Sequence, residues 1–248
     1  KGTRISEESH LKPKPMIEIG GKPILWHIMK MYAAYGHNEF IVCCGYKGYV
    51  IKEYFYHYFL HNSDMTVDLS NNDLTIHNSN AENFKVTLVD TGLETMTAGR
   101  LKRVQQYIGE ERFLLTYGDG VCDINMDEQL KFHEAKGAAC TMSIVQPGSR
   151  FGMIGLDDQD TVTEFAEKPK EDGAWINGGF FICEPKTFDY LPDDADNVMW
   201  ERYPLEQLTA DGQLAAYRHE GFWKCMDTLR DNIDLNTMWE EHPKWKNW

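Results

Sequence analysis

The chain has 248 residues, of which 42% are hydrophobic and 12% aromatic, so it can bury a full core and is not a disordered protein. Its formal net charge of −14 argues against broad binding of nucleic acid or anionic membrane, which needs a basic face, although a nucleotide needs only a few local cations. The sequence has no run of about eighteen apolar residues, so we expect no membrane span, and it shows no signal-peptide pattern.

The first residues, 1–16, form a basic segment that is similar to the second half of a phosphate-binding loop. Gly2 would let backbone N–H groups approach phosphate oxygens closely. Arg4 would bring a planar cation to the same anion, and Lys14 would bring a compact one. The alternative is a solvated basic segment with two turn prolines, and these residues alone favour neither interpretation.

Apolar periodicity and turn residues predict helices that alternate with strands through the first half of the chain. In chain order they predict a helix over 23–36, a strand over 39–45, a helix over 47–60, a β-hairpin around Asn71–Asn72 within 61–83, a strand over 84–90, a helix over 100–107, a strand over 112–120, a helix over 127–137 and a strand over 138–145. The strand over 39–45 is expected to be buried. Because such alternation builds parallel βαβ units, this half predicts an α/β fold.

The second half of the chain is richer in strands. The patterns predict strands over 153–157, 161–168 and 176–185, and helices over 203–211 and 228–240. This change predicts a mixed sheet. No repeat or low-complexity linker interrupts the sequence, so we expect a single domain over 1–248, with 61–95 as a hairpin-containing insertion or loop region.

A phosphate loop in an α/β fold normally follows a buried strand. No residue precedes Lys1 in this sequence. We therefore expect the first strand of the sheet to lie upstream of Lys1, in a segment of about ten residues. The sheet would then have a vacant central position, and a complete sheet would contradict this expectation.

Two aspartates lie at the ends of apolar runs. Asp119, in the sequence YGDG, lies at the edge where open α/β sheets bind ligands, and its glycine neighbours leave room for a hydrated divalent cation. Asp227, in WKCMDTLRD, follows apolar residues and precedes a helix. Each has an ordinary alternative, a turn aspartate for Asp119 and a helix N-cap for Asp227. The fold could also bring both carboxylates to one Mg²⁺.

Two further segments have residues suited to a phosphorylated sugar. Glu167 and Lys168 close the strand over 161–168, where a lysine beside a glutamate can hold a phosphate and a sugar hydroxyl; the alternative is a charged surface turn. Asn177 and Gly178 open an aromatic strand in which paired glycines admit another molecule or backbone closely; the alternative is a β-bulge.

Arg100 follows a loop of small and polar residues, 95–99, that ends at Gly99 and leads into a helix. Such a loop could admit a flat base to its backbone groups, with Arg100 at the edge. The alternative is a surface arginine at a helix start. The sequence has no HExxH, GxSxG or triad-like pattern, so it supports no Ser or Cys nucleophile.

The six cysteines indicate a reducing environment. None forms a CxxC pair, and most lie in apolar stretches, where free buried thiols are usual. We therefore expect a cytoplasmic protein without a zinc site.

Five of these segments occur in the order that is typical of the sugar-1-phosphate nucleotidyltransferases, and the chain resembles that family over nearly its whole length. The segments are GTR with PKPM, YGDG, FAEKP, NGGFF and WKCMDTLRD. The resemblance implies a Rossmann-like, glycosyltransferase-A-type three-layer fold with a mixed central sheet, dependence on Mg²⁺ and assembly as a homo-oligomer. The family's leading glycines are absent, so part of the triphosphate loop is not in this sequence.

The resemblance also implies a role for each matched residue. Lys14 and Arg4 would be the catalytic cations, at the α-phosphate and at the leaving pyrophosphate. The nucleotide would be bound by Gly2, Thr3, Arg4, Lys14, Gly99, Arg100 and Asp119, the metal by Asp119 and Asp227, and the sugar phosphate by Glu167, Lys168, Asn177 and Gly178.

Stretches such as LVDTG, GRLKRV and MDTLRD are most similar to family members that use CTP. They imply that CTP and α-D-glucose 1-phosphate react to CDP-glucose and pyrophosphate, a product used in deoxysugar and lipopolysaccharide O-antigen synthesis. Neither nucleic acid nor a membrane is expected as a partner. The alternatives are a uridylyl- or thymidylyltransferase and a non-catalytic nucleotide-sugar-binding module.

Overall fold

In a computed structural model, the protein is described over residues 12–147, 153–156, 162–166 and 174–248. The helices are α2 (Ile24–Ala33), α3 (Gly48–His61), α4 (Thr97–Ile108), α5 (Met126–Lys136), α6 (Tyr203–Ala210) and α7 (Leu229–Glu241), with short 3-10 helices η1 (Lys14–Met16), η2 (Pro185–Tyr190) and η3 (Ala195–Asn197). The strands are β1 (Glu18–Ile19), β2 (Lys22–Pro23), β3 (Glu39–Cys44), β4 (Ser63–Asp68), β5 (Asp73–Ser79), β6 (Lys85–Asp90), β7 (Phe113–Thr116), β8 (Gly120–Cys122), β9 (Cys140–Val145), β10 (Met153–Leu156), β11 (Val162–Ala166), β12 (Ile176–Cys183), β13 (Leu214–His219) and β14 (Trp223–Cys225).

The main sheet is mixed, as predicted. Its strand order is β13-β9-β12-β7, in which β12 runs antiparallel to both neighbours and β13 runs parallel to β9. A separate parallel pair joins β3 to β6. The α/β fold class that the sequence predicts is therefore confirmed.

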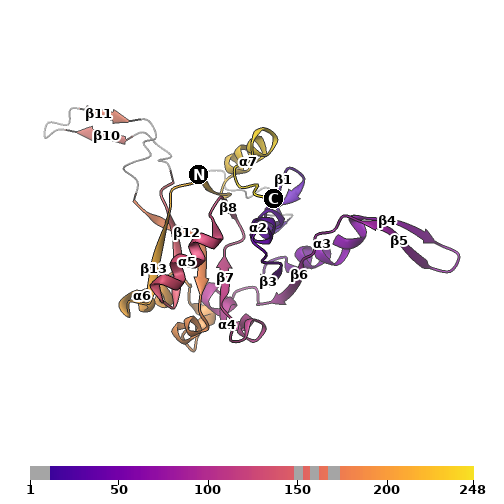
Figure 1. Ribbon diagram of the computed structural model, residues 1–248, viewed down its shortest axis with the longest axis horizontal. Helices are drawn as coiled ribbons and strands as arrows, with labels where there is room; N and C mark the ends of the chain where they lie inside the picture. Colours follow the sequence, from indigo (N-terminus) through magenta and orange to yellow (C-terminus); the bar gives the residue numbers. More distant parts are fainter. Residues whose placement is uncertain (1–11, 148–152, 157–161, 167–173) are drawn as a thin grey trace.

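Helices cover both faces of this sheet, so the architecture has three layers (Figure 1). Successive side chains of a strand point to opposite faces, and β12 shows the result. Phe180 packs in a core with α2 and α7, whereas Phe181 packs in a second core with α4 and α6. No helix in the described part of the chain combines the length and the apolar character needed to cross a membrane.

An apolar cleft separates the two groups of strands. A cavity of about 880 Å³ is lined by side chains of β3 and β7 and of the helices α2 and α4. Within the described residues, no strand pairs with the edge of β3 or of β7 that faces this cavity. The strand over 39–45 was expected to be buried, but β3 is mostly half-buried because of this opening. The cleft would accommodate a further apolar strand, and the expectation that it lies upstream of Lys1 stays a prediction.

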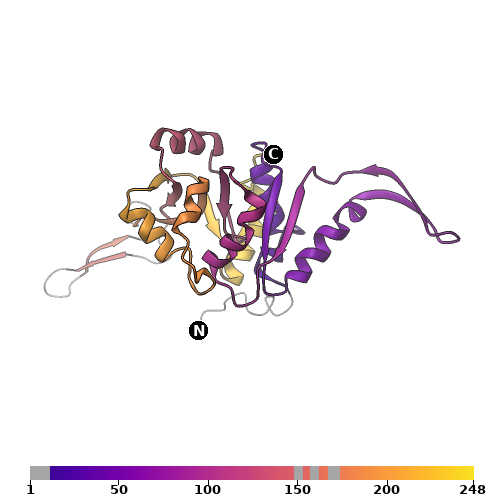
Figure 2. The same cartoon turned by 90° about the horizontal axis from the view of Figure 1, so that it is seen from below.

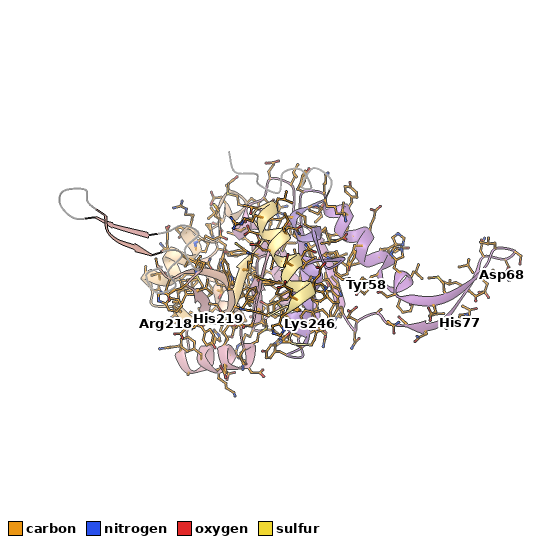
Figure 3. All side chains as sticks on the ribbon, turned by 90° about the horizontal axis from the view of Figure 1, so that it is seen from above. Tyr58, Asp68, His77, Arg218, His219 and Lys246 are labelled. Atoms are coloured by element: carbon orange, nitrogen blue, oxygen red, sulfur yellow. The ribbon has the colours of Figure 1, made fainter. Side chains whose placement is uncertain are left out.

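The hairpin expected within 61–83 is confirmed and forms an arm together with α3. β4 pairs antiparallel with β5, and Asn72 in the turn adopts the left-handed conformation with φ of 57°. The arm projects from the body on the side opposite to the β10–β11 hairpin in both ribbon views (Figures 1 and 2). Asp68 lies near its outer end and Tyr58 lies where α3 leaves the body (Figure 3).

Several elements differ from the expectations, and those that bear on the site are the following. The helix predicted from Arg100 begins at Thr97, so Gly99 and Arg100 lie inside α4 and not ahead of it. The run over 112–120 is two strands, β7 and β8, that separate at Tyr117. Strands β13 and β14 were not predicted, and β14 is the one that positions the site.

Candidate active site

Pairing of two short strands brings the two candidate metal ligands together. β8 pairs antiparallel with β14, with Gly120 opposite Cys225. Asp119 directly precedes β8 and Asp227 follows β14, so both aspartates lie at the same end of this pair. The backbone bond from Met226 N to Asp119 O, 2.8 Å long, extends the pairing to this point.

Lys14 lies between these carboxylates. Its Nζ donates to Asp119 Oδ2 over 2.5 Å and to Asp227 Oδ1 over 2.6 Å. The side chains of Lys14, Asp119 and Asp227 keep 33%, 30% and 53% of their exposure, so the cluster opens to solvent on one side. We call these three residues the Lys14 cluster.

The segment that carries Lys14 is fixed by prolines. Pro13 and Pro15 flank Lys14 and favour the tight turn of η1. Pro15 rests on the backbone of Gly118, where a Cβ would lie 2.9 Å from Pro15 Cγ. The glycine of YGDG that precedes Asp119 is therefore needed for η1 to approach, which explains part of this motif in packing terms.

The electrostatics of the cluster keep Lys14 charged. Partial burial on its own lowers the pKa of Lys14, but the hydrogen bonds and charges of Asp119 and Asp227 outweigh it and raise the pKa above the ordinary value. Burial, together with the charge of Asp227, raises the pKa of the neighbouring Cys225 thiol to about 12. Cys225 is therefore a thiol that donates to Asp227 Oδ2 over 3.3 Å and not a thiolate nucleophile.

Asp227 is not the N-cap of the following helix. Thr228 is the N-cap of α7, and its side chain forms a capping box with Asp231. The carboxylate of Asp227 is thus directed to the cluster, where it faces Lys14. The ordinary interpretation of this aspartate is wrong, and its position fits a role in binding.

The carboxylates of Asp119 and Asp227 lie close enough together to contact one cation, Lys14, and oxygen ligands so placed suit a hard divalent metal ion. Within the described residues, no group of three or more His, Cys, Asp or Glu side chains could hold a metal by itself. Mg²⁺ is commonly bound through one or two carboxylates, with water and substrate phosphate oxygens completing its shell. The donor set of Asp119 and Asp227 therefore fits Mg²⁺ better than a tightly caged metal.

Asn177 and Gly178 lie beside the cluster, next to the strands that form it. Asn177 Nδ2 donates to Tyr117 Oη over 3.1 Å, and Trp223 Nε1 donates to Gly178 O over 2.7 Å. The register of β12 against β9 shifts between Asn177 and Phe181, so the β-bulge that the glycines suggested is present. These contacts join the predicted sugar site to the turn that bears Asp119 and to β14.

Arg100 is half-buried and bonded within the protein. Its Nη1 donates to Thr91 Oγ1 over 2.7 Å and to Cys44 O over 3.4 Å, and its Nη2 donates to Leu93 O over 3.3 Å. These bonds tie α4 to the carboxyl end of β3 and to the loop after β6. Arg100 is therefore not the surface arginine of the ordinary interpretation.

Gly99 is buried in the first turn of α4. A Cβ on Gly99 would lie 2.6 Å from Asp196 Cα, which explains the glycine by the close approach of η3. The expectation that Gly99 and Arg100 contact a base stays a prediction.

Gly2, Thr3, Arg4, Glu167 and Lys168 lie outside the described residues, so their predicted roles stay predictions. Sequence reasoning missed Tyr117 and Trp223, which bond Asn177 and Gly178, and Glu201, which lies beside Tyr117. Tyr117 could have been found, because it begins the YGDG motif. Nothing in the sequence marks Glu201, which comes from a segment about eighty residues away in the chain.

Comparison with known proteins identifies a family whose members this chain resembles. Residues 1–241 match the family model described as nucleotidyl transferase. The chain is 52% identical to a glucose-1-phosphate cytidylyltransferase of Salmonella typhi over 249 residues, covering 100% of this chain and 96% of that protein. It is 48% identical to a probable glucose-1-phosphate cytidylyltransferase of Bacillus subtilis (strain 168), with the same coverage of both chains.

Solved structures show the same fold at lower identity. The crystal structure of HddC from Yersinia pseudotuberculosis superposes with a TM-score of 0.68 at 23% identity, covering 96% of this chain and 95% of that chain. At this identity the similarity concerns the fold alone. It supports the mixed three-layer architecture described above.

Proposed function

This chain belongs to the nucleotidyl transferase family, and we propose that it transfers the cytidylyl group of CTP to α-D-glucose 1-phosphate, giving CDP-glucose and pyrophosphate. The high identity to cytidylyltransferases of two bacteria, along the whole chain, supports CTP and glucose 1-phosphate as substrates. The observation that carries the proposal is the Lys14 cluster, which provides a cation and two metal-type carboxylates at one point.

The reaction needs positioning more than proton transfer. An oxygen of the sugar phosphate attacks the α-phosphorus of CTP in line, and the bond to the pyrophosphate oxygen breaks with its electron pair leaving on pyrophosphate. A phosphate monoester is largely a dianion at neutral pH, so no general base is required. Two unit charges 4 Å apart repel by about 4 kcal/mol at an effective dielectric constant of about 20, so several cations are needed to hold two phosphates together.

Lys14 meets part of this need. We assign it to the α-phosphate region, where its ammonium group can stabilise the charge that develops on the phosphates in the transition state. We assign Arg4 to the leaving pyrophosphate, and Gly2 and Thr3 to loop contacts with CTP. Gly99 and Arg100 are assigned to the base side, where Arg100 fixes the loop after β6 through its bonds to Thr91 and Leu93.

Asp119 and Asp227 are the residues that would hold Mg²⁺. When bound, Mg²⁺ would neutralise phosphate charge and orient the triphosphate. Lys14 bridges the two carboxylates and offsets their mutual repulsion.

The sugar phosphate is assigned to Glu167, Lys168, Asn177 and Gly178. Asn177 and Gly178 support this assignment by their position next to the turn that carries Asp119. The carbonyl of Gly178 is held by Trp223, which belongs to the strand leading to Asp227.

Pyrophosphate release tests the proposal. The protein would be assayed with Mg²⁺ and glucose 1-phosphate against CTP, UTP, dTTP, ATP and GTP in turn. We expect release with CTP, at least about tenfold above the other nucleotides. Preference for UTP or dTTP would keep the reaction and contradict the base assignment. Tight CTP binding without release from any nucleotide would instead identify a non-catalytic binding module.

We further propose that the protein is a homo-oligomer and that the arm is part of its interface. Val67 lies directly opposite Leu74, and Met65 opposite Ile76, so these side chains share one face of the hairpin. Val67, Leu74 and the turn residue Leu69 are exposed by 53%, 45% and 84%. A two-stranded ribbon with an uncovered apolar face is marginally stable in water, which supports a second copy of this chain as its cover.

The variant Leu74→Lys is expected to weaken assembly at least about tenfold in Kd, because it places a charge on the apolar face of the hairpin. Thr75→Lys is the matched control, since Thr75 pairs with Thr66 on the opposite, polar face. Light scattering after size-exclusion chromatography would measure the mass of each variant. An unchanged mass for Leu74→Lys across the concentration range would contradict the role of the arm.

A cytoplasmic location is part of the same proposal. All six cysteines are free thiols in the structure. Cys140 and Cys183 lie on neighbouring strands with their sulfur atoms 3.7 Å apart, yet they are not joined. Reduced thiols and nucleotide substrates both suit a reducing compartment.

A further inference from the structure

A line of hydrogen bonds starts at Asn177 and fixes how its amide points. Asn177 Oδ1 accepts a bond from Gly179 N over 2.8 Å. Because a backbone N–H can only donate, the amide oxygen must face Gly179. The amide nitrogen then faces Tyr117 Oη, 3.1 Å away. Among the residues that the structure describes, nothing else bonds the Asn177 amide, so one N–H and one oxygen lone pair remain for another molecule.

The hydroxyl of Tyr117 has its direction set by an acid. The carboxylate of Glu201 lies beside the Tyr117 hydroxyl and can only accept, so the phenol oxygen is left to accept from Asn177 Nδ2 over 3.1 Å. At each contact in this series of hydrogen bonds, the donor and the acceptor are therefore fixed.

Glu201 is itself held in place from α4. Its Oε2 accepts from Thr97 Oγ1 over 2.9 Å, and that hydroxyl oxygen accepts from Trp200 N over 2.7 Å. Thr97 is the first residue of α4, the helix that carries Gly99 and Arg100. These contacts thus connect Asn177, on the predicted sugar side of the site, to α4, the helix predicted to lie beside the nucleotide base.

Packing holds the Tyr117 ring where these bonds require it. Gly179 has a φ of +79°, and a Cβ there would lie 2.5 Å from Cδ2 of the Tyr117 ring. The ring also meets Phe181 edge to face, with centroids 6.0 Å apart. Packing against two β12 residues therefore holds the ring in place and keeps its hydroxyl near Asn177.

We propose that Tyr117 and Glu201 are positioning residues that hold Asn177 for the hexose and set hexose selectivity. This inference rests on the proposed function, in which Asn177 contacts the sugar. A polar group whose direction is fixed rejects an epimer that cannot pair with it, because the group would be left unsatisfied. Without the Tyr117 hydroxyl, the Asn177 amide loses one of the two bonds that orient it.

Kinetics of Tyr117→Phe test this role, since phenylalanine keeps the ring and removes only the hydroxyl. We expect the KM for glucose 1-phosphate to rise about tenfold, the value of one hydrogen bond, with the KM for CTP nearly unchanged. The preference for glucose 1-phosphate over galactose 1-phosphate should fall. Glu201→Gln should also raise the KM for glucose 1-phosphate, because an amide can either donate to the Tyr117 hydroxyl or accept from it and so no longer fixes its direction.

Tyr190→Phe is the matched control, as Tyr190 bonds Asp211 at the exposed end of η2.

A double-mutant cycle separates positioning from a general structural role. In an Asn177→Ala background, Tyr117→Phe should add no further rise in the KM for glucose 1-phosphate. Equal losses in both backgrounds, or unchanged sugar KM and selectivity in Tyr117→Phe, would overturn the inference while the wild type still makes CDP-glucose. A wild type that makes no CDP-glucose would overturn the proposed function and this inference with it.

Discussion

Replacing Lys14 with alanine should lower kcat by about 10²–10³-fold, the usual cost of removing one electrostatic stabiliser from a reaction centre. The reason is its position, 2.5 Å from Asp119 and 2.6 Å from Asp227, where no other described cation contacts both carboxylates. The cost should fall on kcat more than on the KM for CTP, because charge builds up on the phosphates as the bond to pyrophosphate breaks.

Lys12→Ala is the control for this variant. Lys12 lies two residues away in the same segment and pairs with Glu18 on the surface, with about half of each side chain exposed. An exposed pair of this kind contributes little, so kcat and the melting temperature should remain close to wild type. A Lys14→Ala enzyme with wild-type kcat would show that the lysine is structural.

The periodic parts of the chain were predictable because they depend on local pattern. Helices such as α2 and α3 present apolar side chains at helical spacing, and strands such as β6 and β9 are short apolar runs between turn residues. The hairpin of the arm could be read in the same way, from strict alternation on either side of Asn71–Asn72. For these elements the tertiary structure agrees with the local preference.

The start of α4 was not predictable, because its first turn depends on distant residues. Thr97 and Gly99 are weak helix formers, and local preference alone places the start at Arg100. In the structure, Met96 N donates to Asp196 O and Ala98 N donates to Val198 O. These bonds satisfy backbone N–H groups that have no partner inside the helix at its N-terminus. The segment after η2 therefore allows α4 to begin at Thr97.

The convergence of Asp119 and Asp227 also depends on long-range pairing. β8 and β14 have three residues each, too few for a periodic pattern. Their pairing is visible only in the fold, where it joins residues about one hundred positions apart. The residues alone left a shared Mg²⁺ site open beside a turn aspartate and an N-cap, and only the family resemblance named both aspartates as metal ligands. The position of Glu201 was unpredictable for the same reason, because Glu201 lies beside Tyr117 only in the folded chain.

Replacing Asp119 with asparagine should remove most of the Mg²⁺-dependent activity, with a loss of about 10²–10³-fold in kcat at ordinary Mg²⁺. Asparagine keeps the size of the side chain and removes one negative charge, so the site would attract a divalent cation less strongly. The backbone bond from Met226 to Asp119 O does not involve the side chain, so β8 and β14 should stay paired. Pyrophosphate release measured against Mg²⁺ concentration, together with the melting temperature, would test both statements.

Asp193→Asn is the matched control for this experiment, because the side chain of Asp193 is fully exposed and only approaches Lys102 at 3.8 Å. It carries the same charge change without touching the Lys14 cluster. Asp227→Asn should reproduce the Asp119→Asn result, since Lys14 contacts both carboxylates and a cation between them would lose one ligand in either variant. Normal activity of either variant at ordinary Mg²⁺ would contradict the assignment of that aspartate to the metal. Activity restored by raising Mg²⁺ would instead support it, because a weakened site binds the same ion at higher concentration.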